Sequence, residues 1–111
     1  MRSIIIGGGK VGFTIAEQLT KEGHDIVVID SDRRVVDAIS DSLDVMALCG
    51  NGSVVGMHSE AGASESDLLI ACTGQDELNL MCCMFAKKLG CRNTIARVRT
   101  PEYAEQIYLI Q

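Results

Sequence analysis

The sequence lacks an excess of positive charge, a long apolar run near its N-terminus and a metal-type cysteine spacing, and each absence excludes a class of protein. Its 111 residues include 10 Lys and Arg but 15 Asp and Glu, which gives a net charge of −5 at pH 7. Proteins that bind nucleic acid gain most of their affinity from clustered cationic side chains. We therefore expect no nucleic acid among the partners of this chain.

Residues 4–6 form a stretch of three isoleucines that ends in a glycine cluster. The apolar core of a secretory signal has about 7–15 residues, and a helix that spans a bilayer has about 20. The sequence therefore predicts a cytoplasmic protein without direct membrane insertion.

The cysteines are odd in number and show neither a C-x-x-C pair nor the Cys and His spacing of a zinc site. They are Cys49, Cys72, Cys82, Cys83 and Cys91. Free cysteine is among the most buried residue types. We expect reduced, mostly buried thiols and no metal site.

Short β-branched runs alternate with longer helix-period runs, and this order is typical of an α/β fold with a parallel sheet. The predicted strands are residues 3–6, 25–29, 45–48, 68–72 and 94–98. The predicted helices begin near Val11, Asp32, Val54, Asp76 and Pro101, the only proline. We predict a Rossmann-type doubly wound parallel sheet in a single domain, residues 1–111.

A glycine-rich loop follows the first predicted strand and opens the first helix. Its residues are Gly7, Gly8, Gly9, Lys10, Val11 and Gly12. The G-x-G-x-x-G pattern is common by itself, but here an acid, Asp30, ends the next strand, as in dinucleotide sites. Gly7 would permit the tight turn, Gly9 the approach of a phosphate, and Gly12 close packing of helix on strand. The alternative is a glycine turn that binds nothing.

Asp30 would accept hydrogen bonds from ribose hydroxyls, and its charge would repel a phosphate at the 2′ position. This favours NAD or an adenosine phosphate over NADP. Arg33 and Arg34 follow closely. They leave open either tolerance for an extra phosphate or a plain role as solvated residues of the second helix.

Small polar residues follow the third and fourth predicted strands, where ligands lie in a doubly wound sheet. Asn51, Gly52 and Ser53 come after the third strand, and Thr73 and Gly74 after the fourth. They fit a ligand crevice, but also ordinary turns in which Ser53 and Thr73 cap the next helices.

Arg97 and Arg99 are two residues apart at the end of the fifth predicted strand, so they would point to the same face. Burying an arginine without an anion is costly, and its planar fork suits phosphate. A polyphosphate tail, a neighbouring acidic subunit and a salt bridge to local carboxylates are the alternative partners.

The fourth predicted helix has two apolar faces. One contains Leu78, Met81, Cys82, Phe85 and Leu89, and the other contains Leu80, Cys83 and Met84. A sheet covers only one face of a helix. We expect the other face to be covered either by the chain's own C-terminal segment or by a second copy of the chain. The second copy would give a homodimer through the fourth and last helices, in which residues 107–110 extend the apolar surface.

The chain resembles the N-terminal nucleotide-binding domain of the Trk-type potassium-uptake regulatory subunit, also called the KTN, RCK N-terminal or TrkA-N domain. The resemblance covers essentially every residue. It rests on the segments IIIGGGKVG, EGHDIVVID, LCGNGS, SESDLLIACTGQDELNL and AKKLGCRNTIARVRTPEY.

This resemblance implies a cytosolic regulatory subunit, not an enzyme, that binds NAD(H) or ATP/ADP and assembles as a homodimer or ring on a membrane potassium transporter. It places the glycine loop at the phosphates, Asp30 at the ribose, Asn51 and Gly52 near the adenine, Thr73 and Gly74 near the second half of the ligand, and Arg97 and Arg99 near the terminal phosphates. Family members usually continue into further strands and often a second domain, so we expect a chain truncated at its C-terminus.

The alternative is the cofactor-binding domain of an NAD-dependent dehydrogenase. Such an enzyme shares the glycine loop but also needs an acid or base near the nicotinamide. His24 and His58 are expected at the surface, away from the crevice. A dehydrogenase would also leave Arg97 and Arg99 unexplained, so this function ranks second.

Overall fold

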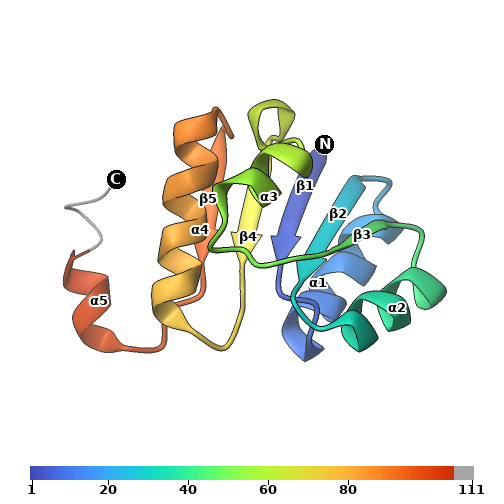
Figure 1. The fold of residues 1–111 in the computed structure, drawn as a ribbon, viewed down its shortest axis with the longest axis horizontal. Coiled ribbons are helices and arrows are strands. Elements are labelled where there is room, and N and C mark those ends of the chain that lie inside the picture. The colour runs from blue at the N-terminus through green and yellow to red at the C-terminus, as the bar shows by residue number, and fades with distance from the viewer. Residues whose placement is uncertain (107–111) are drawn as a thin grey trace.

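Five parallel strands form one sheet in the order β3-β2-β1-β4-β5 in a computed structural model of the chain (Figure 1). The structure describes residues 1–106, and the side chains of residues 1–103. The strands are β1 (Arg2–Ile6), β2 (Asp25–Asp30), β3 (Met46–Cys49), β4 (Leu68–Ala71) and β5 (Asn93–Ala96). The helices are α1 (Lys10–Lys21), α2 (Arg33–Ser42), α3 (Val55–Glu60), the 3-10 turn η1 (Ala63–Glu65), α4 (Asp76–Leu89) and α5 (Pro101–Gln106).

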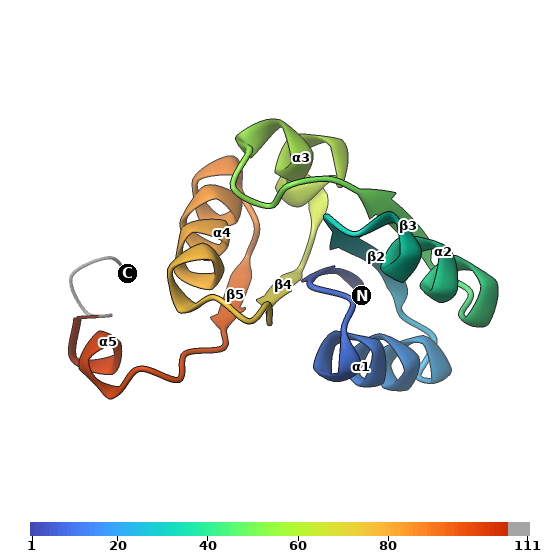
Figure 2. The ribbon, with the colours of Figure 1, turned by 60° about the horizontal axis from the view of Figure 1, so that its bottom comes forward.

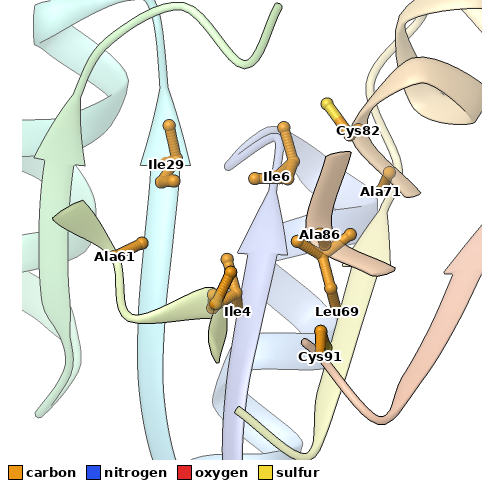
Figure 3. Close-up of a cluster of buried hydrophobic side chains, with 10 residues drawn as sticks. Ile4, Ile6, Ile29, Ala61, Leu69, Ala71, Cys82, Ala86 and Cys91 are labelled. Atoms are coloured by element: carbon orange, nitrogen blue, oxygen red, sulfur yellow. The ribbon is translucent and has the colours of Figure 1, made fainter. Parts of the chain in front are cut away.

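Helices cover both faces of this sheet, which is why its strands are apolar throughout. Ile4 and Ile6 lie on the face covered by α3 and α4, in a cluster that reaches Cys82 (Figure 3). Ile5 points the other way and packs with Ala16 of α1. Figure 2 shows α1 and α2 on one side of the sheet and α3 and α4 on the other. The predicted Rossmann-type α/β fold is therefore confirmed.

Three helix ends have local chemistry that favours a start or a stop. Asp32 caps α2, because its carboxylate accepts a hydrogen bond of 2.9 Å from the Arg34 amide. Gly90 ends α4 with a φ of 113°, a left-handed conformation that glycine adopts without strain. Pro101 opens α5, where its missing N–H costs nothing.

The order in which the strands are added to the sheet reverses between β1 and β4. From β1 it passes to β2 and β3 on one side, and then returns to β4 and β5 on the other. Ser3 of β1 pairs with both Ile26 and Leu68. The carboxyl ends of β1 and β4 therefore mark the topological switch point, where open α/β sheets place their ligands.

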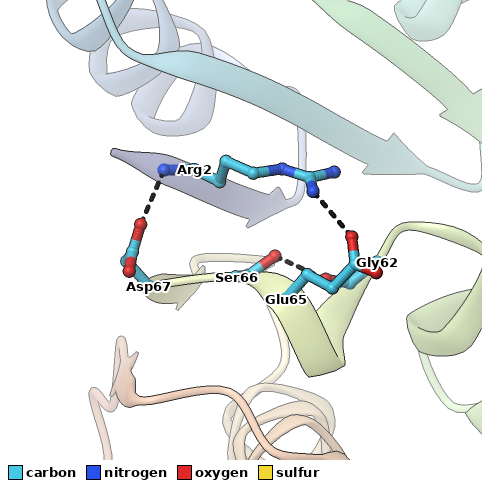
Figure 4. Close-up of polar contacts among 5 residues, drawn as sticks. All are labelled: Arg2, Gly62, Glu65, Ser66 and Asp67. Carbon is cyan, nitrogen blue, oxygen red and sulfur yellow. Dashed lines mark hydrogen bonds and ion pairs between the residues drawn. The ribbon is translucent and has the colours of Figure 1, made fainter.

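Polar contacts fasten the amino-terminal ends of the central strands β1 and β4, at the end of the sheet opposite the switch point. The Arg2 guanidinium lies 2.8 Å from Glu65, and the Arg2 amide donates to Asp67 at 2.9 Å (Figure 4). Ser66 is buried and donates its hydroxyl proton to the Gly62 carbonyl at 2.8 Å. These bonds hold the turn before β4 beneath the start of β1.

Two local predictions are wrong. His58 is fully buried rather than exposed. The fifth strand ends at Ala96, so Arg97 and Arg99 follow it instead of sharing a strand face. On α4, Met81 is 40% exposed and Asn79 is buried.

None of the helices within residues 1–106 is long and apolar enough to cross a membrane.

Candidate nucleotide-binding crevice

A crevice of about 680 Å³ opens at the carboxyl ends of the strands, at the topological switch point. It is lined by Ile6, Gly7, Gly9, Lys10, Val11, Ile29, Asp30, Ser31, Gly50, Asn51, Gly52, Cys72, Thr73, Gly74, Gln75, Leu78 and Arg97. Ten of the thirteen predicted site residues are in this lining. The other three, Gly8, Gly12 and Arg99, are not. The structure thus gathers the ends of β1, β2 and β4 and the loops after β3 and β5 around one space.

Gly7 and Gly12 make the glycine loop possible by their lack of a side chain. Gly7 has a φ of 102°, which a residue with a side chain rarely adopts. A Cβ on Gly12 would lie 1.7 Å from the Gly7 carbonyl oxygen, so α1 packs against the turn only because this residue is glycine. Gly8 is also enclosed, since its Cβ would lie 2.3 Å from the Ile39 side chain. Gly8 and Gly12 therefore shape the loop from outside the crevice.

The first turn of α1 borders the crevice, and its backbone N–H groups have no hydrogen-bond partner among the described residues. Gly9 precedes the helix without a side-chain cap, and no acidic residue lies in the first turn. Free N–H groups and the positive end of the helix dipole favour an anion at such a position. A Cβ on Gly9 would meet no atom within 4 Å, so this residue borders open space. Lys10 adds a positive charge to the same wall.

Asp30 is held at the crevice by two backbone amides. Its Oδ2 accepts from Gly8 N at 2.8 Å, and its Oδ1 accepts from Asp32 N at 2.8 Å. A carboxylate has about four lone-pair positions, so both oxygens keep capacity for ligand hydroxyls. The bond to Gly8 also ties the acid directly to the phosphate loop.

The loop after β3 is held from behind by buried side chains of α3 and α4. The Gly52 carbonyl accepts a hydrogen bond of 2.8 Å from His58 Nε2 and a bond of 3.3 Å from the Cys82 thiol. His58 also meets Phe85 edge to face, with ring centroids 5.7 Å apart. Its burial is explained by these contacts. His58 therefore supports the crevice wall without lining it.

The helix caps that the alternative interpretation gave to Ser53 and Thr73 are absent. Neither hydroxyl caps a helix, because Val54 precedes α3 and Gln75 precedes α4 without a capping bond. Ser53 instead donates both its amide and its hydroxyl proton to Asn51 Oδ1, at 2.9 and 2.8 Å. These bonds stabilise the turn after β3.

Thr73 and Arg97, on neighbouring loops of the crevice, share one buried partner. Asn79 Oδ1 accepts from the Thr73 amide at 2.9 Å and from the Thr73 hydroxyl at 2.7 Å. Asn79 Nδ2 donates to the carbonyls of Thr73 at 3.1 Å and Arg97 at 2.9 Å. The side chain of Asn79 thus links the ends of β4 and β5.

Asp76 fastens the segment that follows Arg97. Both of its carboxylate oxygens accept from the Arg99 amide at 3.0 Å, and one also accepts from the Thr100 amide at 2.7 Å. Hydrogen bonds from Thr100, and then from Arg99, hold the pKa of Asp76 below its usual range. The charge of Arg99 adds to this lowering of the pKa.

Burial raises the pKa of several thiols in the loop after β4 and on α4 above the ordinary value. Burial raises the pKa of Cys72, although the charge of Arg97 opposes the shift. Burial also raises the pKa of Cys82 to about 12 and that of Cys83 to about 11. All cysteines are free, and Cys72, Cys82 and Cys91 are buried, as predicted. Within the described residues, no group of His, Cys, Asp or Glu side chains is arranged to hold a metal ion.

Sequence reasoning missed Asn79 and the role of His58. Both are polar residues on helices, and their partners are 6 to 18 residues away in sequence. One signal was available: Asn79 lies three residues before Cys82 and seven before Ala86, so it shares the helix face of these apolar residues. A polar residue inside an apolar face indicates a buried hydrogen-bonding role.

The sheet order, the glycine loop and the crevice define a Rossmann-type domain of the kind that holds nucleotides at its switch point. The sequence matches the model of the TrkA-N domain over residues 3–111. The chain belongs to the TrkA-N domain family.

Curated relatives carry the name of a potassium uptake system. A "Trk system potassium uptake protein TrkA homolog" from Methanothermobacter thermautotrophicus is 36% identical over 105 residues, which cover 95% of this chain and 49% of the relative. A protein of the same name from Archaeoglobus fulgidus is 39% identical over 106 residues, covering 96% of this chain and 24% of the relative. The chain thus spans about half or less of the length of these relatives.

Solved structures share the fold at low sequence identity. The GsuK channel bound to NAD has a TM-score of 0.84 at 19% identity, with 98% of this chain and 20% of that chain covered. Identity at this level supports the shared architecture alone.

Proposed function

We propose that this chain is the nucleotide-sensing domain of a regulator of Trk-type potassium uptake. It binds NAD(H) or ATP/ADP without chemical conversion, and conveys the ligand state to a membrane potassium transporter subunit from the cytoplasmic side. The observation that carries this proposal is the single crevice lined by the glycine loop, Asp30 and Arg97. Membership in the TrkA-N family and the names of the relatives support the link to potassium uptake.

In this proposal the ligand extends across the switch point. The phosphates lie at the first turn of α1, beside Lys10 and Val11, and the ribose binds Asp30. The adenine lies near Asn51 and Gly52, and the second half of the ligand lies near Thr73 and Gly74. An NAD-bound channel with the same fold supports a dinucleotide as one such ligand.

Arg97 provides the charge that distinguishes ligands by their phosphates. With the described side chains of residues 1–103, its guanidinium makes no ion pair. A crevice arginine without a carboxylate partner suits a phosphate. Ligands with different phosphate number would contact Arg97 differently and so favour different arrangements of the protein. Arg99 lies outside the lining, so we assign it a lesser part.

Calorimetric titration with NAD, NADH, ATP, ADP and NADP tests this function. We expect binding of NAD(H) or ATP/ADP, with NADP weaker because of the Asp30 charge, and no hydride transfer to or from small alcohols or acids. Turnover would support the dehydrogenase alternative instead. Absence of binding to all five nucleotides would contradict the proposal.

We also propose that two copies associate through α4. Met81 and Met84 are 40% and 48% exposed on its outer side. An apolar patch of this kind marks an interaction surface. Residues 107–110, expected to extend the patch, lie outside the described residues.

A further inference from the structure

The crevice wall that would meet the anionic half of a ligand depends on one buried amide. Thr73 and Arg97 lie on two loops, after β4 and β5, and both line the crevice. Asn79 lies one turn into α4, is completely buried and does not line the crevice. An asparagine side chain has two acceptor positions and two donors. All four are used on Thr73 and Arg97.

Arg97 has few other restraints on its position. The segment from residue 97 to residue 100 has no regular structure. The Arg97 amide donates to the Ala71 carbonyl at 2.8 Å, which continues the β5 pairing by one residue. Its carbonyl is bound by Asn79. The backbone of Arg97 is therefore fixed on one side by β4 and on the other by Asn79.

We propose that Asn79 is a positioning residue that determines how strongly the site favours ligands with a phosphate beyond the first. This inference rests on the proposed nucleotide-binding function. Asn79 holds the Arg97 backbone at a fixed place relative to Thr73, so that the guanidinium reaches the second phosphate of ADP or NAD. The single phosphate of AMP lies at the glycine loop, which Asn79 does not touch.

The alternative is that Asn79 contributes stability alone. Removal of the Asn79 side chain would leave its buried hydrogen-bond partners unsatisfied, here the Thr73 amide and two carbonyls. Such a loss would lower the stability of the whole domain and weaken all ligands alike. The two roles are separated by the ratio of affinities for AMP and ADP, which a general loss of stability does not change.

The test is a set of calorimetric titrations with AMP, ADP and NAD on four proteins: wild type, Asn79→Ala, Arg97→Ala and the double variant. We expect Asn79→Ala to weaken ADP and NAD by about tenfold, as for loss of one charge-assisted contact, and to change AMP by less than about twofold. Arg97→Ala should have the same pattern. Asn79→Ala should add no further selective loss when Arg97 is already alanine.

Ser66→Ala is a matched control. Ser66 is also buried and donates to a backbone carbonyl (Figure 4), but it precedes the amino-terminal end of β4, away from the crevice at the carboxyl ends of the strands. We expect this variant to lower stability and to leave the AMP to ADP ratio within about twofold of the wild-type value. If Asn79→Ala fails to fold, Asn79→Asp replaces it. The aspartate keeps the size and the acceptor for Thr73 but cannot donate to the Arg97 carbonyl when ionised, so we expect the same selective loss.

Several results would overturn this inference. They are an equal loss of AMP and ADP in the Asn79 variants, an undiminished Asn79 effect in the Arg97→Ala protein, and an unchanged ratio in Arg97→Ala itself. In each of these cases the wild type still binds nucleotides, so the proposed function stands. A wild type that binds no nucleotide would instead contradict the proposed function, and this inference with it.

Discussion

Asp30 has two roles, one in the fold and one in the crevice. Its carboxylate binds the Gly8 amide of the phosphate loop and the Asp32 amide at the start of α2. It also lines the crevice. A ligand therefore meets an acid whose orientation is already set, and binding does not have to order this side chain.

Replacement of this acid should lower both affinity and selectivity for NAD. We expect Asp30→Ala to weaken NAD by about tenfold, because hydrogen bonds to a charged group are lost. NADP should lose less, because the repulsion of its 2′ phosphate is lost at the same time. Titration of both nucleotides measures the ratio. The control is Asp32→Ala, which removes the cap of α2 but not a crevice residue. Equal losses for NAD and NADP would refute this role of Asp30.

At the scale of single elements, the turn from β1 to α1 separates glycines needed for packing from glycines needed for a ligand. We expect Gly12→Ala to destabilise the domain by about 3 kcal/mol or more, because the new Cβ would collide with the Gly7 carbonyl. Gly9→Ala should cost less than about 1 kcal/mol, because its Cβ enters open space. The added methyl group would occupy part of the space proposed for the phosphate, so the affinity for NAD should fall.

Urea unfolding and titration with NAD distinguish the two glycine variants. The matched pair differs by one methyl group at two positions of one loop. A Gly12→Ala protein as stable as Gly9→Ala would show that the turn opens at little cost. A Gly9→Ala protein with wild-type NAD affinity would place the phosphate elsewhere.

Asp76, in the first turn of α4, should make the free energy of unfolding depend on pH. The pKa of Asp76 is lowered from its ordinary value of 3.8, first by Thr100 and then by Arg99. A carboxylate whose pKa is lowered by folding stabilises the protein above the unfolded-state value, and this contribution is lost as the pH falls toward the folded-state value. We expect the stability difference between wild type and Asp76→Asn to be constant above pH 3.8 and to shrink below it.

Urea unfolding of both proteins at a series of pH values, from about pH 7 to about pH 3, measures this difference. If the two curves remain parallel over the whole range, the bonds from Arg99 and Thr100 contribute nothing to the ionised form.

Across the whole molecule, the sequence was sufficient for the strands but not for the buried polar contacts. Strands such as β1 read as continuous apolar runs because helices cover both faces of a parallel sheet. His58 and Asn79 are buried because carbonyls from other loops accept their protons. No local pattern contains that information, since the partners meet only after folding. For the same reason, the sequence placed Arg97 in the crevice but did not separate it from Arg99.

The exposed methionines of α4 predict the state of association. If two copies meet through this helix, Met84→Glu should convert a dimer to a monomer, because a charge would be buried at the contact. Light scattering at high micromolar concentration measures the mass. The control is Met46→Glu, since Met46 is 59% exposed on β3, at the other edge of the sheet. A wild-type monomer under these conditions would contradict the dimer.

The position of β1 between β2 and β4 has a consequence for the order of folding. The pairing of β1 with β2 joins residues 23 positions apart, such as Ser3 and Ile26, whereas its pairing with β4 joins Ser3 to Leu68. Contacts between distant residues form late, because closing a long loop costs entropy before any contact compensates for it. We therefore expect β1, β2 and β3 to assemble before β4 docks. The crevice spans the junction between β1 and β4, which forms last. A bound nucleotide would therefore contact both sides of this junction and slow the unfolding of the domain.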